Sequence, residues 1–198
     1  NERALLDYLD RLRNDFPRRG VLVQEYLPGA EYSVSLIGNP DQGLRALPFL
    51  EVDYSRLDSK LPKILGYESK WEPESAYWTQ IKYIEANLPD HVQQQLIEHS
   101  TRLFERLCCR DYARFDYRAD AKGEIKLLEV NPNPGWCWDG KLNLMASFSG
   151  MRYTDLLAQI LGAAEERLGI VAKPQAATVN GSQTHVAANG GQHAPAVG

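Results

Sequence analysis

Residues 112–135 read YARFDYRADAKGEIKLLEVNPNPG and carry the clearest structural pattern in the chain. Its first and last parts have the apolar patterns of strands, and the turn-forming ADAKG segment separates them. Side chains alternate across a strand, so Arg114 and Asp116 share one face, as do Glu129 and Asn131. The stretch therefore predicts a hairpin with two carboxylates, an amide and a guanidinium on one face.

The length of the hairpin connection determines which of these side chains are opposite each other. If ADAKG contains an even loop, Asp116 lies opposite Leu127 with Glu129 as its diagonal neighbour, and Arg114 opposes Glu129. Two carboxylates at this spacing repel unless a cation lies between them, and Mg²⁺ with substrate phosphates would remove the repulsion. We therefore predict a metal and phosphate site in which Arg114 holds phosphate or developing negative charge. The alternative is an exposed, salt-bridged hairpin whose NPNPG segment only ends a strand.

Length and composition indicate one domain or one large lobe. The chain has 198 residues, 43% of them hydrophobic, which is enough to build a core. A net charge of -4 without a basic run argues against a general nucleic-acid or anionic-membrane binder, and no apolar segment approaches the length of a membrane span. Three cysteines without metal-site spacing favour a reducing cytoplasm. Because the first residue is not Met and no signal peptide is visible, we expect a fragment of a longer chain.

The sequence before the hairpin predicts one helix and three strands. Leucines at helical spacing predict a first helix that stops near Pro17. In EYSVSLIG, the alternation places Tyr32, Val34 and Leu36 on one face of a strand, while Pro48 limits the ladder of the strand that follows. The expected helix covers residues 5–16, and the expected strands cover 21–26 (VLVQEY, read as buried), 31–38 and 44–52.

The rest of the chain predicts an irregular segment, two helices and a tail. Residues 54–82 show no clean period, and a long segment of this kind in a compact domain is usually functional or mobile. Amphipathic helices are expected over 90–109 and after Thr154, which could cap the second. The predicted fold class is α+β, a mainly antiparallel sheet with packed helices over residues 1–172. Residues 173–198 lack the apolar side chains needed for a core and are expected to be disordered.

The hairpin resembles the metal-binding end of ATP-grasp ligases, in the D-alanine–D-alanine ligase-like branch. The signature of that branch runs R-x-D, a short turn, then apolar-E-x-N-x-x-P-G. Upstream, VLVQEYLPGAEYSV is similar to the hinge strand that receives adenine, and LGYESKW is similar to the YEAKY segment whose lysine contacts phosphate. These motifs cover residues 21 to 135 in the family's order. The resemblance implies the C-terminal lobe of an ATP-grasp domain, truncated at its N-terminus.

This resemblance implies a metal site and catalytic groups on the hairpin. Asp116 and Glu129 would bind Mg²⁺, with Glu129 bridging two ions and Asn131 completing the second; Mn²⁺ could replace Mg²⁺. Arg114 and the backbone N–H of Gly135 would stabilise the tetrahedral intermediate.

The resemblance also implies a nucleotide site. Gln24 stands where the family often has an acid, and its amide oxygen can still accept the adenine N–H. For Lys70, expected on a mobile loop over the phosphates, the alternative is an ordinary solvated loop lysine. The expected nucleotide contacts are Gln24, Glu25, Tyr26, Leu27, Glu31, Lys70 and Leu128.

The residues after Gly135 are expected to select the second substrate. The family's dipeptide ligases have a segment with serine and leucine here, whereas this chain has WCWDGKLNLM. Trp136 and Trp138 would form rigid walls, while Asp139 and Lys141 would pair with an ammonium and a carboxylate. The combination suits an amino-acid-like acceptor larger than alanine. Core packing is the alternative role for the tryptophans.

The implied activity is ATP- and Mg-dependent ligation of a carboxylate to an amine through an acyl phosphate. The expected partners are ATP, the two substrates and preceding domains that supply a glycine-rich loop and part of the first substrate site; a homodimer is also compatible. This lobe alone would bind nucleotide weakly and catalyse nothing. Two alternatives stay open, namely a degenerate ATP-grasp module that binds nucleotide or a partner without ligation, and an ATP-grasp phosphotransferase.

Overall fold

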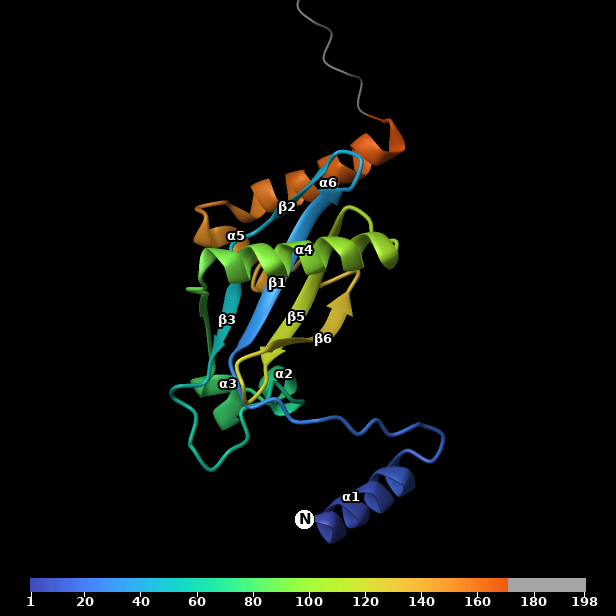
Figure 1. Ribbon diagram of the computed structural model, residues 1–198, viewed down its shortest axis with the longest axis vertical. Coiled ribbons are helices and arrows are strands. Elements are labelled where there is room, and N and C mark those ends of the chain that lie inside the picture. The colour runs from blue at the N-terminus through green and yellow to red at the C-terminus, as the bar shows by residue number, and fades with distance from the viewer. Residues whose placement is uncertain (171–198) are drawn as a thin grey trace, which may run out of the picture.

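The protein is built on one antiparallel sheet that carries helices on both faces (Figure 1). The computed structural model describes residues 1–170. The strand order is β4-β3-β1-β5-β6, with β2 pairing on β1, and every pairing is antiparallel. The strands are β1 (Glu31–Asn39), β2 (Gly43–Ala46), β3 (Leu50–Asp53), β4 (Lys82–Glu85), β5 (Tyr112–Ala119) and β6 (Ile125–Asn131). The predicted α+β class is confirmed.

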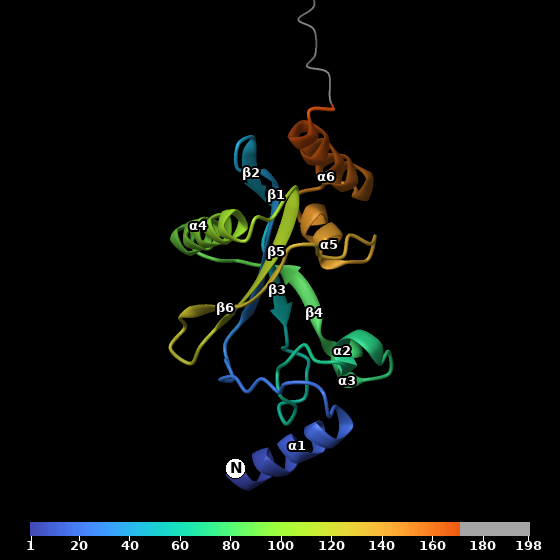
Figure 2. The same ribbon diagram turned by 90° about the vertical axis from the view of Figure 1, so that its right-hand side faces the viewer.

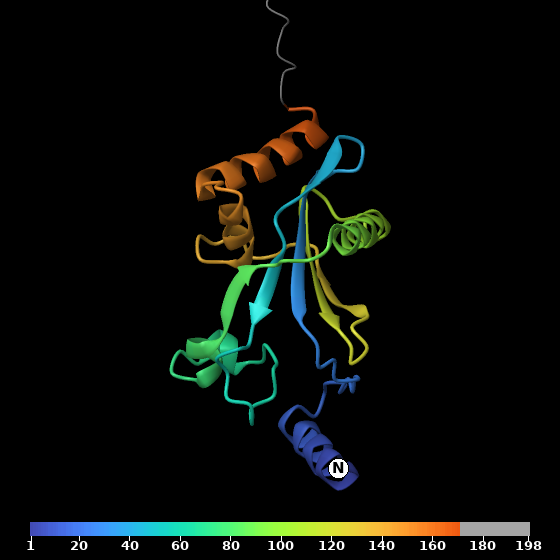
Figure 3. The same ribbon diagram turned by 60° about the vertical axis from the view of Figure 1, so that its left-hand side comes forward.

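The helices divide between the two faces of the sheet. Figure 2 shows α4 on one face and α5 and α6 on the other, while α1 lies apart at the end of an extended segment (Figure 3). Among residues 1–170, no helix is long and apolar enough to cross a membrane. The helices are α1 (Glu2–Asp15), α2 (Glu68–Trp71), α3 (Ala76–Gln80), α4 (Asp90–Arg106), α5 (Lys141–Phe148) and α6 (Tyr153–Leu168).

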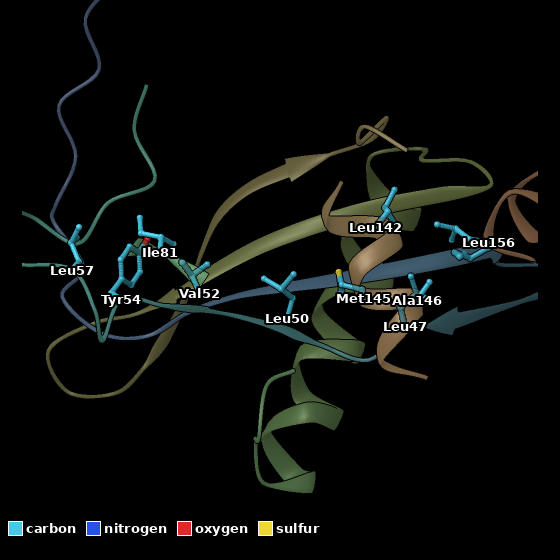
Figure 4. Packing of buried hydrophobic residues seen from close by; sticks show 11 residues of the cluster. Leu47, Leu50, Val52, Tyr54, Leu57, Ile81, Leu142, Met145, Ala146 and Leu156 are labelled. Carbon is cyan, nitrogen blue, oxygen red and sulfur yellow. The ribbon is translucent and has the colours of Figure 1, made fainter. Parts of the chain in front are cut away.

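Each face of the central strand β1 contributes to a different core. Val34 and Leu36 pack with Phe115 and with Phe104 of α4, as the predicted alternation requires. The opposite core joins Leu50 of β3 to Met145 and other residues of α5 and α6 (Figure 4). Because β1 is buried on both faces, it fixes the positions of both helical layers.

The predicted buried strand over residues 21–26 is wrong. These residues form no strand, and Leu22 and Val23 are exposed. A strand needs a neighbour for its backbone groups, and no described strand pairs with this segment. Ladder-like bonding to β5 begins later, where the Gly29 N–H donates to the Ala119 carbonyl at 2.9 Å.

Several predicted boundaries also change. The expected strand over 44–52 separates into β2 and β3 around Pro48, which cannot donate to a ladder. Helix α4 ends before Cys108, whose positive φ of 54° is not helical. Thr154 lies inside α6, and Arg152 with Asp155 forms its capping box instead. The sequence did not predict α5. The proposed boundary after residue 172 and the disorder of 173–198 lie outside the described residues.

An ion pair fastens α6 to the sheet. The Asp111 carboxylate accepts from Nε and Nη2 of Arg167 at 2.9 and 2.8 Å, and from Nδ2 of Asn39 at 3.1 Å. Hydrogen bonds from Arg167, and then Asn39, hold the pKa of Asp111 below its usual value against the opposing effect of burial.

We predict that Asp111→Asn lowers the free energy of unfolding by about 1–3 kcal/mol at pH 7. Asparagine tolerates the positive φ of 68° at this position, so the change removes charge without straining the backbone. The stabilisation from a carboxylate with a lowered folded pKa is present above the unfolded pKa, about 3.9, and is lost as the pH falls through the folded value. Urea titrations should show the difference between the two proteins shrinking below about pH 4. A difference that stays constant with pH would rule out the charge as its source.

Candidate functional site

A row of polar side chains crosses the face of the sheet that α5 partly covers. Antiparallel pairing places these side chains on successive rungs of one face. The rungs are Ser35–Arg114–Asn131, Ser33–Asp116–Glu129 and Glu31–Arg118. The two acids predicted to bind metal are therefore direct cross-strand neighbours.

The predicted register of the hairpin is wrong, although the predicted shared face is right. Asp116 faces Glu129 instead of Leu127, and Arg114 faces Asn131 instead of Glu129. The carboxylates are thus closer partners than the even loop implied, which increases their need for positive charge.

Two local features produce this register. The Asp120 N–H donates to the Glu124 carbonyl and Gly123 has a φ of 84°, so the loop contains three residues. Leu128 is then an extra residue in β6, a β-bulge between the Tyr117–Leu127 and Asp116–Glu129 pairs. As a result, consecutive residues Leu128 and Glu129 both line the same cavity.

Asp116 is buried and held by three side chains. Arg114 donates to it through Nε and Nη2, each at 2.9 Å, and the Ser33 hydroxyl donates at 2.7 Å. The Asn131 amide nitrogen donates at 3.1 Å to both Asp116 and Glu129. Burial alone would raise the pKa of Asp116, but Lys141, followed by Arg114 and Ser33, lowers it below the usual value. Asp116 is therefore a carboxylate at neutral pH.

Lys141 lies beside this acid row because of the way α5 crosses β1. Met145 accepts from the Ser35 hydroxyl at 3.3 Å, and Lys141, one helical turn earlier, donates to the Ser33 hydroxyl at 3.4 Å. Its Nζ lies 5.5 Å from the centroid of the Tyr83 ring and forms no ion pair with any acid in residues 1–170. Burial lowers the pKa of Lys141, while Asp116 opposes that shift. The ammonium group thus has donors free for an anionic ligand.

One cavity of about 650 Å³ extends from the acid row to the hinge segment. Most of the side chains predicted for nucleotide, metal and phosphate line this cavity. They are Gln24, Glu25, Tyr26, Leu27, Glu31, Lys70, Arg114, Asp116, Leu128, Glu129 and Lys141. The structure therefore brings together residues separated by more than a hundred positions in the chain.

The other predicted residues lie outside the lining of this cavity. Trp136 and Trp138 are 51% and 71% exposed, and Asp139 is exposed as well. Packing in the core is therefore not their role. Gly135 is exposed, and its N–H donates to no acceptor among the described residues. Asn131 reaches the site through its hydrogen bonds to the two acids.

Sequence reasoning missed Arg118, Tyr83, Ile64 and Leu65, which also line the cavity. Arg118 follows Asp116 by two positions on β5, so the alternation that grouped Arg114 with Asp116 also places Arg118 on their face. The two aliphatic residues come from the segment 54–82, which has no period, and Tyr83 follows it directly on β4, so the sequence carried no usable signal for these three residues.

The oxygen donors suit Mg²⁺. Residues 1–170 contain no cluster of three or more His, Cys, Asp and Glu side chains that would form an all-protein metal cage. Mg²⁺ instead commonly uses one or two carboxylates together with substrate phosphates. Asn131 now bridges Asp116 and Glu129 through its nitrogen, and a half-turn of the amide would present its oxygen instead. These three residues therefore fit the ion.

Comparison with protein families identifies the chain. Residues 2–162 match the family model described as D-ala D-ala ligase C-terminus. The chain belongs to this family. A protein of Sinorhizobium fredii named "Uncharacterized protein y4sG" is 33% identical over 146 residues, which cover 74% of this chain and 41% of that protein. A D-alanine–D-alanine ligase of Desulfotalea psychrophila is 28% identical over 160 residues, or 81% of this chain and 46% of the ligase. The chain thus spans less than half the length of these relatives.

Solved structures of the family share the fold. A D-alanine–D-alanine ligase from Bacillus anthracis, crystallised in complex with ATP, superposes with a TM-score of 0.60 at 20% identity and covers 83% of this chain and 48% of the ligase. D-alanyl-alanine synthetase A of Vibrio cholerae gives 0.53 at 23% identity, over 70% of this chain and 39% of the synthetase. The predicted ATP-grasp C-terminal fold is confirmed.

We predict that Gly29→Ala detaches the hinge from β5. A Cβ at residue 29 would lie 2.6 Å from the Cβ and 2.7 Å from the carbonyl oxygen of Ala119, so the backbone would have to move. Overpacking of this kind costs roughly 1–3 kcal/mol, and the amide of residue 29 should exchange hydrogen faster. Gly20→Ala is the matched control, because a Cβ there meets nothing within 4 Å. Equal exchange rates and stability in the two variants would contradict the proposed anchoring role.

Proposed function

We propose that this chain forms the C-terminal part of the active site of an ATP-dependent carboxylate–amine ligase. The observation that carries the proposal is the single cavity that joins the hinge segment to the Arg114, Asp116 and Glu129 row. Membership of the D-ala D-ala ligase C-terminus family supports the same reaction class. The remainder of the protein would supply the glycine-rich loop and the site of the first substrate.

The nucleotide would lie along this cavity with adenine at the hinge. Gln24 would accept the adenine N–H through its amide oxygen, with Glu25, Tyr26 and Leu27 continuing the hinge, and Leu128 would contribute apolar surface. Glu31 would bind the ribose hydroxyls. Lys70, on α2, would bind the phosphates from the segment 54–82, whose closure would exclude water from a hydrolysable intermediate.

Asp116, Glu129 and, after amide rotation, Asn131 would hold Mg²⁺ or Mn²⁺, which screens the crowded phosphate oxygens. In this proposal Glu129 would serve as a ligand for two metal ions. The pairing of Asp116 with Glu129 on one rung supports a shared metal site, since Asn131 Nδ2 lies 3.1 Å from an oxygen of each carboxylate.

Arg114 is positioned to bind negative charge that develops during the reaction. Its two hydrogen bonds to Asp116 use Nε and Nη2 and leave Nη1 for a substrate oxygen.

In the first step a substrate carboxylate would attack the γ-phosphorus and release ADP. In the second, an amine would attack the acyl carbon, lose a proton and release phosphate, with Arg114 and the Gly135 N–H stabilising the tetrahedral oxyanion.

Lys141 is the proposed anchor for the carboxylate of the amine substrate. Its unpaired ammonium faces the cavity where the acyl carbon would lie, beside Asp116. Trp136, Trp138 and Asp139 would contribute to the rim through which this acceptor enters. An acceptor larger than alanine fits the size of these side chains.

The proposal predicts that the full-length protein converts ATP to ADP and phosphate only when a carboxylate and an amine are both present. Glu129→Gln should lower turnover by at least roughly 10²-fold because it replaces a charged metal ligand with a neutral amide. Glu124→Gln on the same hairpin is the control, since Glu124 is exposed and, within residues 1–170, forms an ion pair only with Lys126. Coupled measurement of ADP, phosphate and amide product tests the prediction.

Other products would overturn the proposal in recognisable ways. Release of AMP and pyrophosphate would indicate adenylating chemistry. Nucleotide binding without turnover would favour the binding module, and phosphate transfer that ignores the amine would favour a phosphotransferase.

We predict that Lys141→Met selectively impairs acceptors that carry a carboxylate. Loss of a buried charged hydrogen bond of about 2 kcal/mol corresponds to a roughly 30-fold lower kcat/KM. The test compares an amino-acid acceptor with its amide in the parent and the variant. Lys122→Met, in the exposed hairpin turn, provides the control. An equal loss of kcat/KM for both acceptors would show that Lys141 does not bind the acceptor carboxylate.

A further inference from the structure

Arg118 connects four separate parts of the chain at the hinge end of the cavity. Its side chain on β5 donates from Nη1 to Oε2 of Glu31 at 2.9 Å and from Nη2 to the Lys63 carbonyl. The guanidinium carbon also lies 5.4 Å from the centroid of the Tyr26 ring and 5.5 Å from that of Tyr54. With only 4% of its surface exposed, Arg118 is fixed in this position.

The contacts of Arg118 leave one oxygen of Glu31 available. Tyr54 donates to Glu31 Oε2 at 2.8 Å, so both donors converge on the same oxygen. No residue within 1–170 donates to Oε1, and Glu31 lines the cavity. A buried carboxylate with one satisfied oxygen is therefore presented to a ligand in a fixed orientation.

Stability alone does not account for this arginine. Its Nε is buried and has no acceptor among the described residues, which is an energetic cost. Replacement of a buried ion pair by apolar side chains is often neutral or stabilising. The Arg118–Glu31 pair is retained at the cavity wall although Arg118 Nε has no acceptor within residues 1–170. The orientation of Glu31 explains this arrangement better than stability does.

We propose that Arg118 is a positioning residue that fixes Glu31 to read the ribose hydroxyls of a nucleoside triphosphate. The same guanidinium holds the hinge through Tyr26, so adenine and ribose recognition depend on one side chain. The inference rests on the proposed nucleotide site and adds to it the residue that sets ribose discrimination.

The decisive measurement is the ratio of affinities for ATP and 2′,3′-dideoxy-ATP, obtained by calorimetry on the full-length protein. The parent should prefer ATP by about tenfold or more, because Glu31 accepts from the hydroxyls. Arg118→Met should bind the two nucleotides nearly equally, with the affinity for the dideoxy analogue little changed. Arg118→Lys should restore part of the preference by returning a donor to Glu31.

The controls separate positioning from general stability. Arg167→Met breaks the ion pair with Asp111, which lies outside the cavity lining, and should keep the parent's ratio. If Arg118→Met does not fold, Tyr54→Phe removes the other donor to Glu31 and should reduce the ratio by a smaller factor.

Two results would overturn the inference. If Arg118→Met weakens the binding of both nucleotides by the same factor, Arg118 only stabilises the fold. If that variant cannot be measured, an unchanged affinity ratio in Tyr54→Phe leads to the same conclusion. If the parent binds neither nucleotide, the proposed nucleotide site itself fails and the inference fails with it. The two failures are distinguished by the parent protein alone.

Discussion

The direct opposition of Asp116 and Glu129 across two antiparallel strands is the constraint around which the site is organised. Like charges at directly opposite positions destabilise a sheet. Three groups offset this repulsion. Arg114 and Asn131 donate hydrogen bonds to Asp116, and the ammonium of Lys141 lies nearby. A face that needs this much positive charge is suited to ligands that bring cations and phosphates together.

The remainder of the fold supports this polar face with two apolar layers. On the reverse of the sheet, Phe115 and Phe104 belong to a continuous core under α4. On the site's own face, α5 and α6 bury the far half of the sheet, and Ser33 and Ser35 let α5 approach β1 closely. On this face, the change from apolar packing to open cavity therefore occurs along β1.

Family membership establishes the fold of this protein, whereas the proposed selection of substrate and nucleotide depends on individual residues. The family match covers most of the chain and establishes its fold, whereas the relatives are more than twice as long as the matched segment. Lys141 lies in the WCWDGKLNLM segment, where the resemblance to the family's dipeptide ligases implies a serine-bearing segment instead. Under the proposed function, Lys141 would select the amine substrate and Arg118 would position Glu31 for the nucleotide.

The hairpin could be predicted from the sequence because alternation along a strand is a local property. The same alternation predicted the shared face of four side chains, Arg114, Asp116, Glu129 and Asn131. The sequence also indicated the hinge and loop residues of the cavity, through motifs that resemble the family's. The sequence did not reveal that Asp116 faces Glu129, because this register depends on the bulge at Leu128 in the folded hairpin. Tertiary contacts likewise decided that residues 21–26 form no strand and that Lys141 reaches the acid row while the neighbouring tryptophans do not. Pairing partners and the approach of a helix come from distant parts of the chain, and a local pattern carries no information about them.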